Sequence, residues 1–395
     1  MAEQQVLTAR WIFPVVAAPL ERGTVTIEGT RIVAVEPHGR RTPDVDLGNT
    51  ALIPGLVNAH THLDLSGLRG RVPPGPAFIG WLKAIIAHRR TQTPEQIDRD
   101  IQTGLDEALR FGTTLIGDIA ADGRSWPILA GASCSSVVFR EIIGLSGPRV
   151  MPVWRQATEW LDEHPDRENC RGGLSPHAPY SVHQTLFRAA GNALVPLAIH
   201  LGETPEELLL IRDHDGPFVD FLREVGAWDE SGLVPSLDWI AWRSERAPAL
   251  LFAHGQYLDP AMTLPEHAAI VYCPRTHHAF GRGRHPVAEL LARRRRVALG
   301  TDSLASNPDL DILAEARFLR QEHPEIPAGL VLRLATLSGA EALGFGASTG
   351  SLEAGKSADL VAIPLPDHAV TDPYALLFAE NDRPRRTMWL GRWRT

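Results

Sequence analysis

The sequence of 395 residues predicts an α/β fold, in which a (β/α)8 barrel carries a small sheet domain made from both chain ends. Three observations predict this class. Eight short apolar runs recur along the middle of the chain. Helical patterns separate most of these runs, which is typical of a parallel sheet covered by helices. Both chain ends instead alternate short apolar stretches with turn signals, as β-hairpins do.

The two chain ends have a similar strand-and-turn character. Near the N-terminus, "GTVTIEGTRIVAVEP" predicts a hairpin with strands at 25–27 and 32–35. Near the C-terminus, "GSLEAGKSADLVAIPL" and "RRTMWLGRWRT" are strand-like segments separated by turns. We therefore expect one small sheet domain that is assembled from both ends.

The middle of the chain alternates predicted strands and helices. The apolar runs cover 52–57, 113–119, 136–142, 173–175, 195–199, 249–252, 268–272 and 297–299. A clear helix lies in "TPEQIDRDIQTGLDEALRFG", where Thr93 can cap the start, Pro94 takes the first position and Gly112 follows the end. The segments "SVHQTLFRAAGNA" and "DLDILAEARFLRQEH" are similar. Eight strands alternating with helices predict the barrel.

The composition is that of an ordinary soluble globular protein, with 44% hydrophobic and 22% charged residues. A net charge of -8 argues against a nucleic-acid partner held by a broad basic surface. The basic run Arg293–Arg296 is interpreted as a solvated helix end near a strand. Three scattered cysteines suggest no disulfide framework and favour the cytoplasm. The absence of a long apolar window predicts neither a signal peptide nor a membrane span.

Polar residues gather where the predicted strands end, which is the edge that carries the active site in such barrels. The first strand leads into His60 and His62, the fifth into His200 and Glu203, and the sixth into His254. The other strands lead to Asp118, Glu141, His177, a group of Arg275, His277 and His278, and finally Asp302. Five histidines and an aspartate at strand ends predict a functional site rather than scattered structural residues.

The spacing of the first two histidines predicts a metal site. Residues two apart in a strand face the same way, so His60 and His62 can point at one ion while Thr61 points away. His200 and Asp302 would complete three nitrogen ligands and one oxygen ligand, which suit a divalent cation. An open position would remain for a water molecule, as a catalytic site requires. Asp302 is also a candidate acceptor for the proton of that water.

Several motifs together resemble the amidohydrolase superfamily, and within it the single-metal deaminase branch of cytosine- and adenosine-type deaminases and triazine hydrolase relatives. They are "IPGLVNAHTH", "SPHAPYS", "HLGET", "FAHG", "CPRTHHAFGRG", "VALGTDSLASN" and "GSLEAGKSADLVAI", and they span nearly the whole chain. The resemblance implies a distorted (β/α)8 TIM barrel at 54–347 and a small β-sandwich of 1–53 with 348–395. It implies metal ligation by His60, His62, His200 and Asp302, proton shuttling by Glu203, water orientation by His254 and substrate contact by His177.

The resemblance further implies a hydrolytic deaminase that acts on a purine-, pyrimidine- or nucleoside-like heterocycle through metal-bound hydroxide. Zn²⁺ is the first choice for the ion and Fe²⁺ the second. The two lysines of the chain, Lys83 and Lys356, follow no predicted strand, so a lysine-bridged pair of metal ions is not expected. Hydrolysis of a cyclic or exocyclic amide or of a triazine C–X bond is the alternative, and a non-catalytic scaffold is a third hypothesis. A homodimer is left open.

Contacts to the substrate are the least constrained part of the sequence. Phe78 and Trp81 either stack on a planar ring or pack within a helix. Arg275 either meets an anionic group or forms a salt bridge, and His277 either contacts a polar substituent or is structural. Related nucleoside deaminases are expected to have an acidic residue for ribose hydroxyls just before the tryptophan, where this chain has Ile79-Gly80. The roles of Asp118, Glu141, His88 and His278 are left open.

Overall fold

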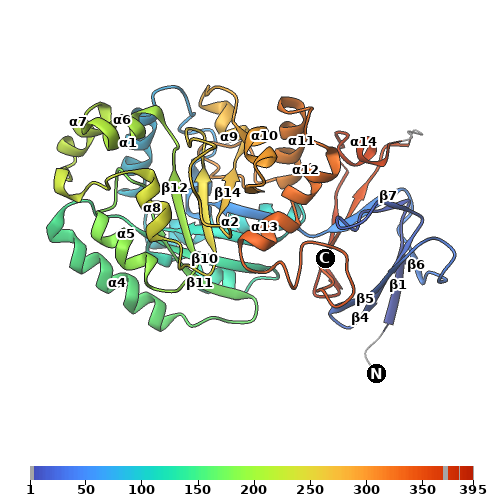
Figure 1. The fold of residues 1–395 in the computed structure, drawn as a ribbon. Helices are drawn as coiled ribbons and strands as arrows, with labels where there is room; N and C mark the ends of the chain where they lie inside the picture. The colour runs from blue at the N-terminus through green and yellow to red at the C-terminus, as the bar shows by residue number, and fades with distance from the viewer. Residues whose placement is uncertain (1–3, 368–371, 382, 395) are drawn as a thin grey trace.

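The computed structural model describes residues 4–367, 372–381 and 383–394. It has two parts, a barrel of strands and helices and a smaller all-β region in which the two ends of the chain lie side by side (Figure 1). The α/β class and the barrel with a sheet region built from both termini are therefore confirmed. The predicted domain limits, 1–53 with 348–395 and 54–347, stay a prediction.

Eight parallel strands form the barrel sheet, in chain order from β8 to β15. They are β8 Leu56–Thr61, β9 Thr113–Ala120, β10 Ser135–Ile142, β11 Cys170–Pro176, β12 Leu197–Leu201, β13 Leu250–His254, β14 Ala269–Tyr272 and β15 Arg296–Leu299. A parallel bridge between Thr61 and Asp302 brings the first strand next to the segment that follows the last one. The sheet is thereby nearly closed, and the ends of its strands share one face.

Helices connect the barrel strands and cover the outside of the sheet (Figure 1). The helices that lie between barrel strands are α1 Phe78–Arg89, α2 Pro94–Arg110, α3 Trp126–Ala130, α4 Val150–Glu163, α5 Gln184–Gly191, α6 Pro205–Asp213, α7 Pro217–Glu224, α8 Leu237–Arg243, α9 Pro274–Ala279 and α10 Val287–Ala292. The last barrel strand is followed by α11 Ile312–Glu322, α12 Ala328–Leu334 and α13 Leu337–Ala342, and α14 Pro373–Leu377 lies in the C-terminal segment. Short 3-10 turns are η1 Leu63–Leu68, η2 Ala121–Gly123, η3 Gly147–Arg149 and η4 Glu230–Gly232.

The start and the end of helix α2 are determined by residues in and next to the helix itself. The Thr93 side chain accepts a hydrogen bond from the Gln96 N–H, and the Gln96 side chain accepts one from the Thr93 N–H at 2.7 Å. This reciprocal cap satisfies two N–H groups that a helix start leaves without partners. Pro94 takes the first helical position, as predicted. The helix ends at Arg110, just before Gly112 with its left-handed φ of 95°.

Two sheets from the chain ends pack around one shared apolar core. The first contains β1 Gln4–Thr8, β4 Thr24–Glu28, β5 Arg31–Glu36 and β6 Val45–Asp46. The second contains β2 Trp11–Ile12, β3 Leu20–Glu21, β7 Thr50–Pro54, β16 Leu360–Pro364, β17 Arg386–Trp389 and β18 Arg392–Trp393. Strands β4 and β5 form the predicted hairpin, and β16 to β18 correspond to the predicted C-terminal strands.

One predicted strand was wrong in its extent. The apolar run 52–57 is not a single barrel strand, because β7 belongs to the terminal sheet and β8 begins the barrel. Gly55 separates them, and its N–H donates to the carbonyl of Asp359 at 2.8 Å. A Cβ at Gly55 would lie 1.9 Å from the Thr114 hydroxyl oxygen, so only glycine fits this crossing. Apolar side chains continue across the break because both strands are buried, which hides the boundary in the sequence.

The basic run Arg293–Arg296 begins directly after α10 and ends at the first residue of β15, as expected for a helix end near a strand. Within the described ranges, no helix combines the length and the apolar character that crossing a membrane would require.

Candidate active site

The first barrel strand delivers two histidines to the face where the strands end. His60 is the fifth residue of β8, and His62 follows the last residue, Thr61. Because side chains alternate along a strand, His60 and His62 point to the same side. Both imidazoles are buried. The backbone therefore orients the two side chains as their spacing predicted.

His60, His62 and His200 form a cluster whose possible ligand nitrogens all lie within 4.8 Å of one another. The Nε2 atoms of His62 and His200 are 3.2 Å apart. The other ring nitrogen of His200, Nδ1, lies 2.9 Å from the carbonyl oxygen of His177, which fixes the ring with Nε2 facing the cluster. His60 Nε2 is buried and has no hydrogen-bond partner. A buried nitrogen without a partner inside a histidine cluster fits a metal ligand.

Asp302 places a carboxylate beside this cluster. Its Oδ1 lies 3.6 Å from His62 Nε2 and 3.9 Å from His60 Nε2. Its Oδ2 accepts a hydrogen bond of 2.7 Å from the Ser306 hydroxyl, which orients the carboxyl group. Asp302 has a left-handed φ of 57°, an uncommon conformation for a residue with a side chain.

Burial sets the protonation of these four side chains. It lowers the pKa of His200 to about 3 and holds the pKa values of His60 and His62 well below their usual range. All three imidazoles are thus neutral near pH 7, the form in which histidine binds metal. Burial raises the pKa of Asp302 to about 6, so it is mostly ionised at pH 7. Three neutral nitrogens and one carboxylate oxygen are a donor set that suits a divalent ion.

Glu203 and His254 lie beside the cluster. Glu203 is in the loop between β12 and α6, and its Oε1 is 3.7 Å from His254 Nε2. Burial raises the pKa of the Glu203 carboxyl to about 8, in the range where a group can both accept and give up a proton near neutral pH. His254 ends β13 with a left-handed φ of 70°, and its carbonyl oxygen lies 2.8 Å from His285 Nε2.

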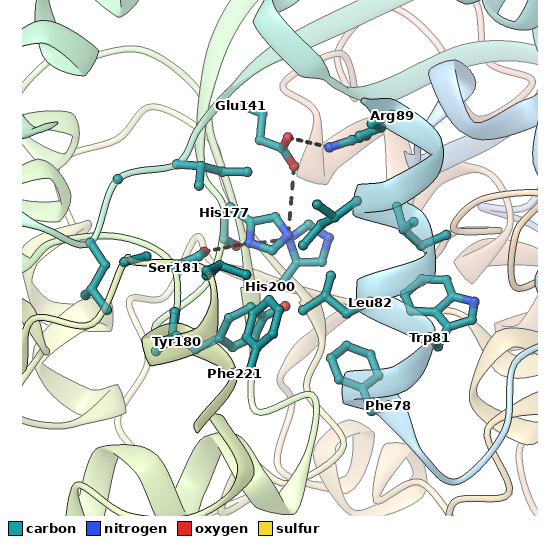
Figure 2. Close-up of a pocket in the computed structure, with 18 of the residues that line it drawn as sticks. Phe78, Trp81, Leu82, Arg89, Glu141, His177, Tyr180, Ser181, His200 and Phe221 are labelled. Carbon is teal, nitrogen blue, oxygen red and sulfur yellow. Dashed lines mark hydrogen bonds and ion pairs between the residues drawn. The ribbon is translucent and has the colours of Figure 1, made fainter. Parts of the chain in front are cut away.

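A cavity of about 410 Å³ opens over this group of residues. Its wall includes eight of the residues predicted to form the site, namely His62, His177, His200, Glu203, His254, Asp302, Phe78 and Trp81. Figure 2 shows Phe78, Trp81 and Leu82 on α1 at one side of the cavity and Phe221 of α7 at another. An apolar wall around a few convergent polar groups is typical of a small-molecule site.

His177 occupies the polar side of the cavity. Its Nδ1 lies 2.7 Å from the Ser181 hydroxyl, and its Nε2 lies 3.8 Å from Glu141 Oε1 (Figure 2). Glu141 also accepts a hydrogen bond of 3.0 Å from Arg89, whose other branch donates to Asp64 at 2.9 Å. Burial lowers the pKa of His177 to about 3, so its ring is neutral. Glu141, whose role the sequence left open, therefore faces the cavity.

The structure does not bring Arg275 and His277 into the described wall of the cavity. The Arg275 guanidinium donates to Glu315 and Asp309 at 2.6 Å each, so it is committed to mostly buried ion pairs. His277 Nε2 lies 2.6 Å from the carbonyl oxygen of Gly283. These contacts favour the structural alternatives for both residues. Helix α9 turns the side chains that follow β14 away from the cavity.

Lys83, Lys356 and Asp118 are absent from the described wall of the cavity. Lys83 on α1 is paired with Glu224, and the Lys356 ammonium donates to the carbonyl of Gly346. Neither lysine lines the described cavity. Asp118 accepts a hydrogen bond of 2.9 Å from the Leu63 N–H, which fixes the start of η1.

Two residues of the site were not predicted from the sequence. Glu207 accepts hydrogen bonds from the N–H groups of Gly202 and Glu203 at 2.8 and 3.1 Å. Its only sequence signal, Thr204 followed three residues later by an acid, is that of a helix cap. Arg282 donates to the carbonyl oxygen of Glu203, although it lies far from Glu203 in the chain. No spacing rule connects these two segments, so only the fold could reveal the contact.

Comparison with known proteins agrees with this geometry. The model of the amidohydrolase family matches residues 51–394. The chain belongs to the amidohydrolase family. It is 30% identical to a 5-methylthioadenosine/S-adenosylhomocysteine deaminase of Syntrophobacter fumaroxidans, over 86% of this chain and 80% of the relative. It is 27% identical to an aminodeoxyfutalosine deaminase of Deinococcus radiodurans, over 86% of each.

A solved structure is similar over nearly the whole length of this amidohydrolase. The zinc-bound adenosine deaminase from Xanthomonas campestris superposes with a TM-score of 0.81 and 25% identity, over 98% of this chain and 92% of the other. The barrel and the terminal sheets are therefore both shared. The family and its deaminase members make this protein a hydrolase of C–N bonds.

Proposed function

We propose that this amidohydrolase removes the amino group from the ring of a purine-, pyrimidine- or nucleoside-like substrate by hydrolysis. One observation carries the proposal. The Glu203 carboxyl, with a pKa near neutrality, lies in the wall of a cavity that also contains neutral histidines and Asp302. The deaminase names of relatives that align along most of this chain support the same activity.

His60, His62, His200 and Asp302 are the residues that would hold the metal ion. A divalent ion bound there would act as a Lewis acid that makes a coordinated water more acidic. Zn²⁺ suits three imidazoles and a carboxylate, and the similar structure from Xanthomonas campestris contains zinc. Fe²⁺ suits the same donors and is the second choice.

Glu203 would move protons between water and substrate. Its carboxylate would accept one proton of the attacking water and deliver it to a ring nitrogen. It would then move the second proton, from the hydroxyl group formed on the ring carbon, to the amine, so that ammonia leaves as the C–N bond breaks and a C=O bond forms. His254, whose Nε2 lies 3.7 Å from Glu203 Oε1, would hold the water in line and stabilise the negative charge that develops on its oxygen.

The cavity wall is suited to a planar ring. Phe78 and Trp81 provide aromatic surface at one side, and their ring centroids are 5.7 Å apart. His177, held by Ser181 and facing Glu141, can present a hydrogen-bonding edge at the other side. Ile79 and Gly80 stand directly before Trp81, so any sugar hydroxyls of a nucleoside substrate would need a partner elsewhere, for which Glu141 is the candidate.

The proposed activity is tested by measuring the ammonia released from a panel of compounds, in reactions supplemented with zinc. Aminopurines, aminopyrimidines, pterins and nucleoside-like compounds should include at least one substrate. Cyclic amides and halogenated triazines in the same panel test the alternative hydrolyses. Turnover of the latter without release of ammonia from any amino-heterocycle would contradict deamination.

Two variants test the assigned residues. Glu203→Gln should retain metal and lose several orders of magnitude in kcat, since general acid–base catalysis is worth about 10²- to 10⁴-fold. His60→Ala should lose both metal and activity, whereas His214→Ala, at an exposed histidine, should retain both. Near-normal turnover by the Glu203→Gln enzyme would remove Glu203 from the mechanism.

A further inference from the structure

Arg282 is an almost buried cation next to the proposed proton shuttle. It lies in the loop between α9 and α10, and its side chain is only 9% exposed. A guanidinium carries five N–H donors and is costly to bury unless those donors are used. The contacts of Arg282 therefore indicate why this loop places it in the interior.

The main contact of Arg282 is to the backbone of Glu203. Its Nη1 donates to the Glu203 carbonyl oxygen, while its Nη2 lies 3.8 Å from the Glu203 carboxylate. The second distance is longer than a charge-assisted hydrogen bond of about 2.8 Å, so the carboxylate is left free to exchange protons. Arg282 thus holds the residue without occupying its reactive oxygen.

Glu203 is held at both ends of its backbone. On its N-terminal side, the Glu203 N–H donates to Glu207 Oε2 at 3.1 Å. On its C-terminal side, the carbonyl oxygen accepts from Arg282. Glu203 lies beyond the end of β12, where no strand ladder fixes the chain. These two side chains supply the restraint that a loop position otherwise lacks.

Arg282 also contacts the aromatic wall of the cavity. Its guanidinium carbon lies 5.3 Å from the ring centre of Phe78 and 4.8 Å from that of Phe280. Both distances are within the range of a cation–π contact. Phe78 lines the cavity at the start of α1. One side chain therefore links the surface on which a ring would rest to the backbone of the proton shuttle.

We propose that Arg282 is a positioning residue, which holds Glu203 in register with a ring bound against Phe78. This inference rests on the proposed deaminase function. Misplacement of a catalytic group by about 1 Å can cost on the order of 100-fold in rate, so the loss of this restraint should appear in kcat. A residue that served only to stabilise the fold would lower the unfolding temperature without changing the turnover of folded enzyme.

The test compares Arg282→Met and Arg282→Lys with a matched control, Arg284→Met. Arg284 lies two residues further along the same loop, is 61% exposed and pairs with Glu325 on the surface. For each zinc-loaded protein we would measure zinc content, unfolding temperature, kcat and KM with the best substrate of the panel. Arg282→Met should bind zinc fully and lose about 10- to 100-fold in kcat, with a much smaller change in KM.

The lysine variant separates positioning from charge alone. Arg282→Lys should have a kcat between those of wild type and Arg282→Met, because lysine keeps a donor but not the planar fork. Arg284→Met should match wild type. A wild-type kcat in folded Arg282→Met would overturn the proposal. If Arg282→Met does not fold, Arg282→Lys decides, and a wild-type kcat there would also overturn it.

Failure of this inference is distinguishable from failure of the proposed function. If Glu203→Gln abolishes turnover while both Arg282 variants turn over normally, only the positioning role is wrong. If no amino-heterocycle releases ammonia, or Glu203→Gln is fully active, the deaminase proposal itself is wrong, and with it the reason to position Glu203.

Discussion

The Thr61 hydroxyl donates a hydrogen bond of 2.9 Å to the main-chain carbonyl of Asp302, across the junction between the first and last barrel strands. Thr61 lies between the two histidines of β8, and Asp302 supplies the carboxylate beside them. The same junction is reinforced by the N–H of Asp302, which donates to the carbonyl of His60 at 3.0 Å. The contacts that close the barrel therefore also bring Asp302 beside His60 and His62, which are three of the four proposed ligands.

Thr61→Val tests the contribution of this hydroxyl. Valine keeps the shape of the buried side chain but removes one hydrogen bond, so the free energy of unfolding should fall by about 1 kcal/mol. Urea unfolding of wild type and variant would measure the change. Thr103→Val, at an exposed position of α2, is the control and should stay within about 0.5 kcal/mol of wild type. Equal losses in the two variants would contradict a special role for the barrel junction.

Ser306→Ala tests the hydrogen bond that orients the Asp302 carboxylate. Without the 2.7 Å bond from Ser306, Asp302 loses both its fixed rotamer and a contact that lowers its pKa. Affinity for zinc should fall about 10- to 100-fold, as is usual when a partner of a metal ligand is removed. Competition with a chelator would measure the affinity. Ser348→Ala, which removes a hydroxyl distant from the site, should bind zinc like wild type.

Asp118→Asn tests a pH dependence of stability. Burial raises the pKa of Asp118 to about 7 in the folded protein, against 3.8 for the ordinary group. Between these values the folded state binds more protons than the unfolded state, so the stability contributed by Asp118 is fully present below pH 4 and is lost as the pH rises through 7. Asparagine cannot ionise and should abolish this loss.

The free energy of unfolding of Asp118→Asn minus that of wild type should therefore increase from pH 4 to pH 8, by on the order of 3 kcal/mol. Measuring the difference at each pH removes contributions from other titrating groups that both proteins share. A difference that does not change with pH would show that the buried carboxyl is not protonated in the folded state near neutrality.

The positions of the four proposed metal ligands could be predicted from the sequence more accurately than those of the residues around them. His60, His62, His200 and Asp302 follow from strand periodicity and from the rule that such barrels carry their sites at one strand edge, and the structure brings their side chains together. Their assignment as metal ligands is still a prediction. The alternation of side chains along a strand is enough to predict these positions, because each of the four residues lies in a buried strand or just beyond its end.

Other features depend on contacts that sequence spacing does not encode. Arg275 follows a strand end just as the histidines do, but α9 begins at Pro274 and directs its guanidinium toward Glu315. Arg282 shows the reverse, since it follows no predicted strand end directly and still reaches Glu203. The break at Gly55 was also hidden, because two strands of different sheets are equally apolar on both sides of it.

The crossing at Gly55 has a consequence for how the protein is made. Strand β7 runs directly into β8, but its partner β16 leaves the ribosome only after the whole barrel has been synthesised. The strand that leads into His60 and His62 can therefore pair early with β2 along one edge, while its other edge stays open until the end of the chain has been synthesised. Chains that stop before β16 would leave one edge of this apolar strand unpaired beside the histidine pair, which favours aggregation over a partly active fragment.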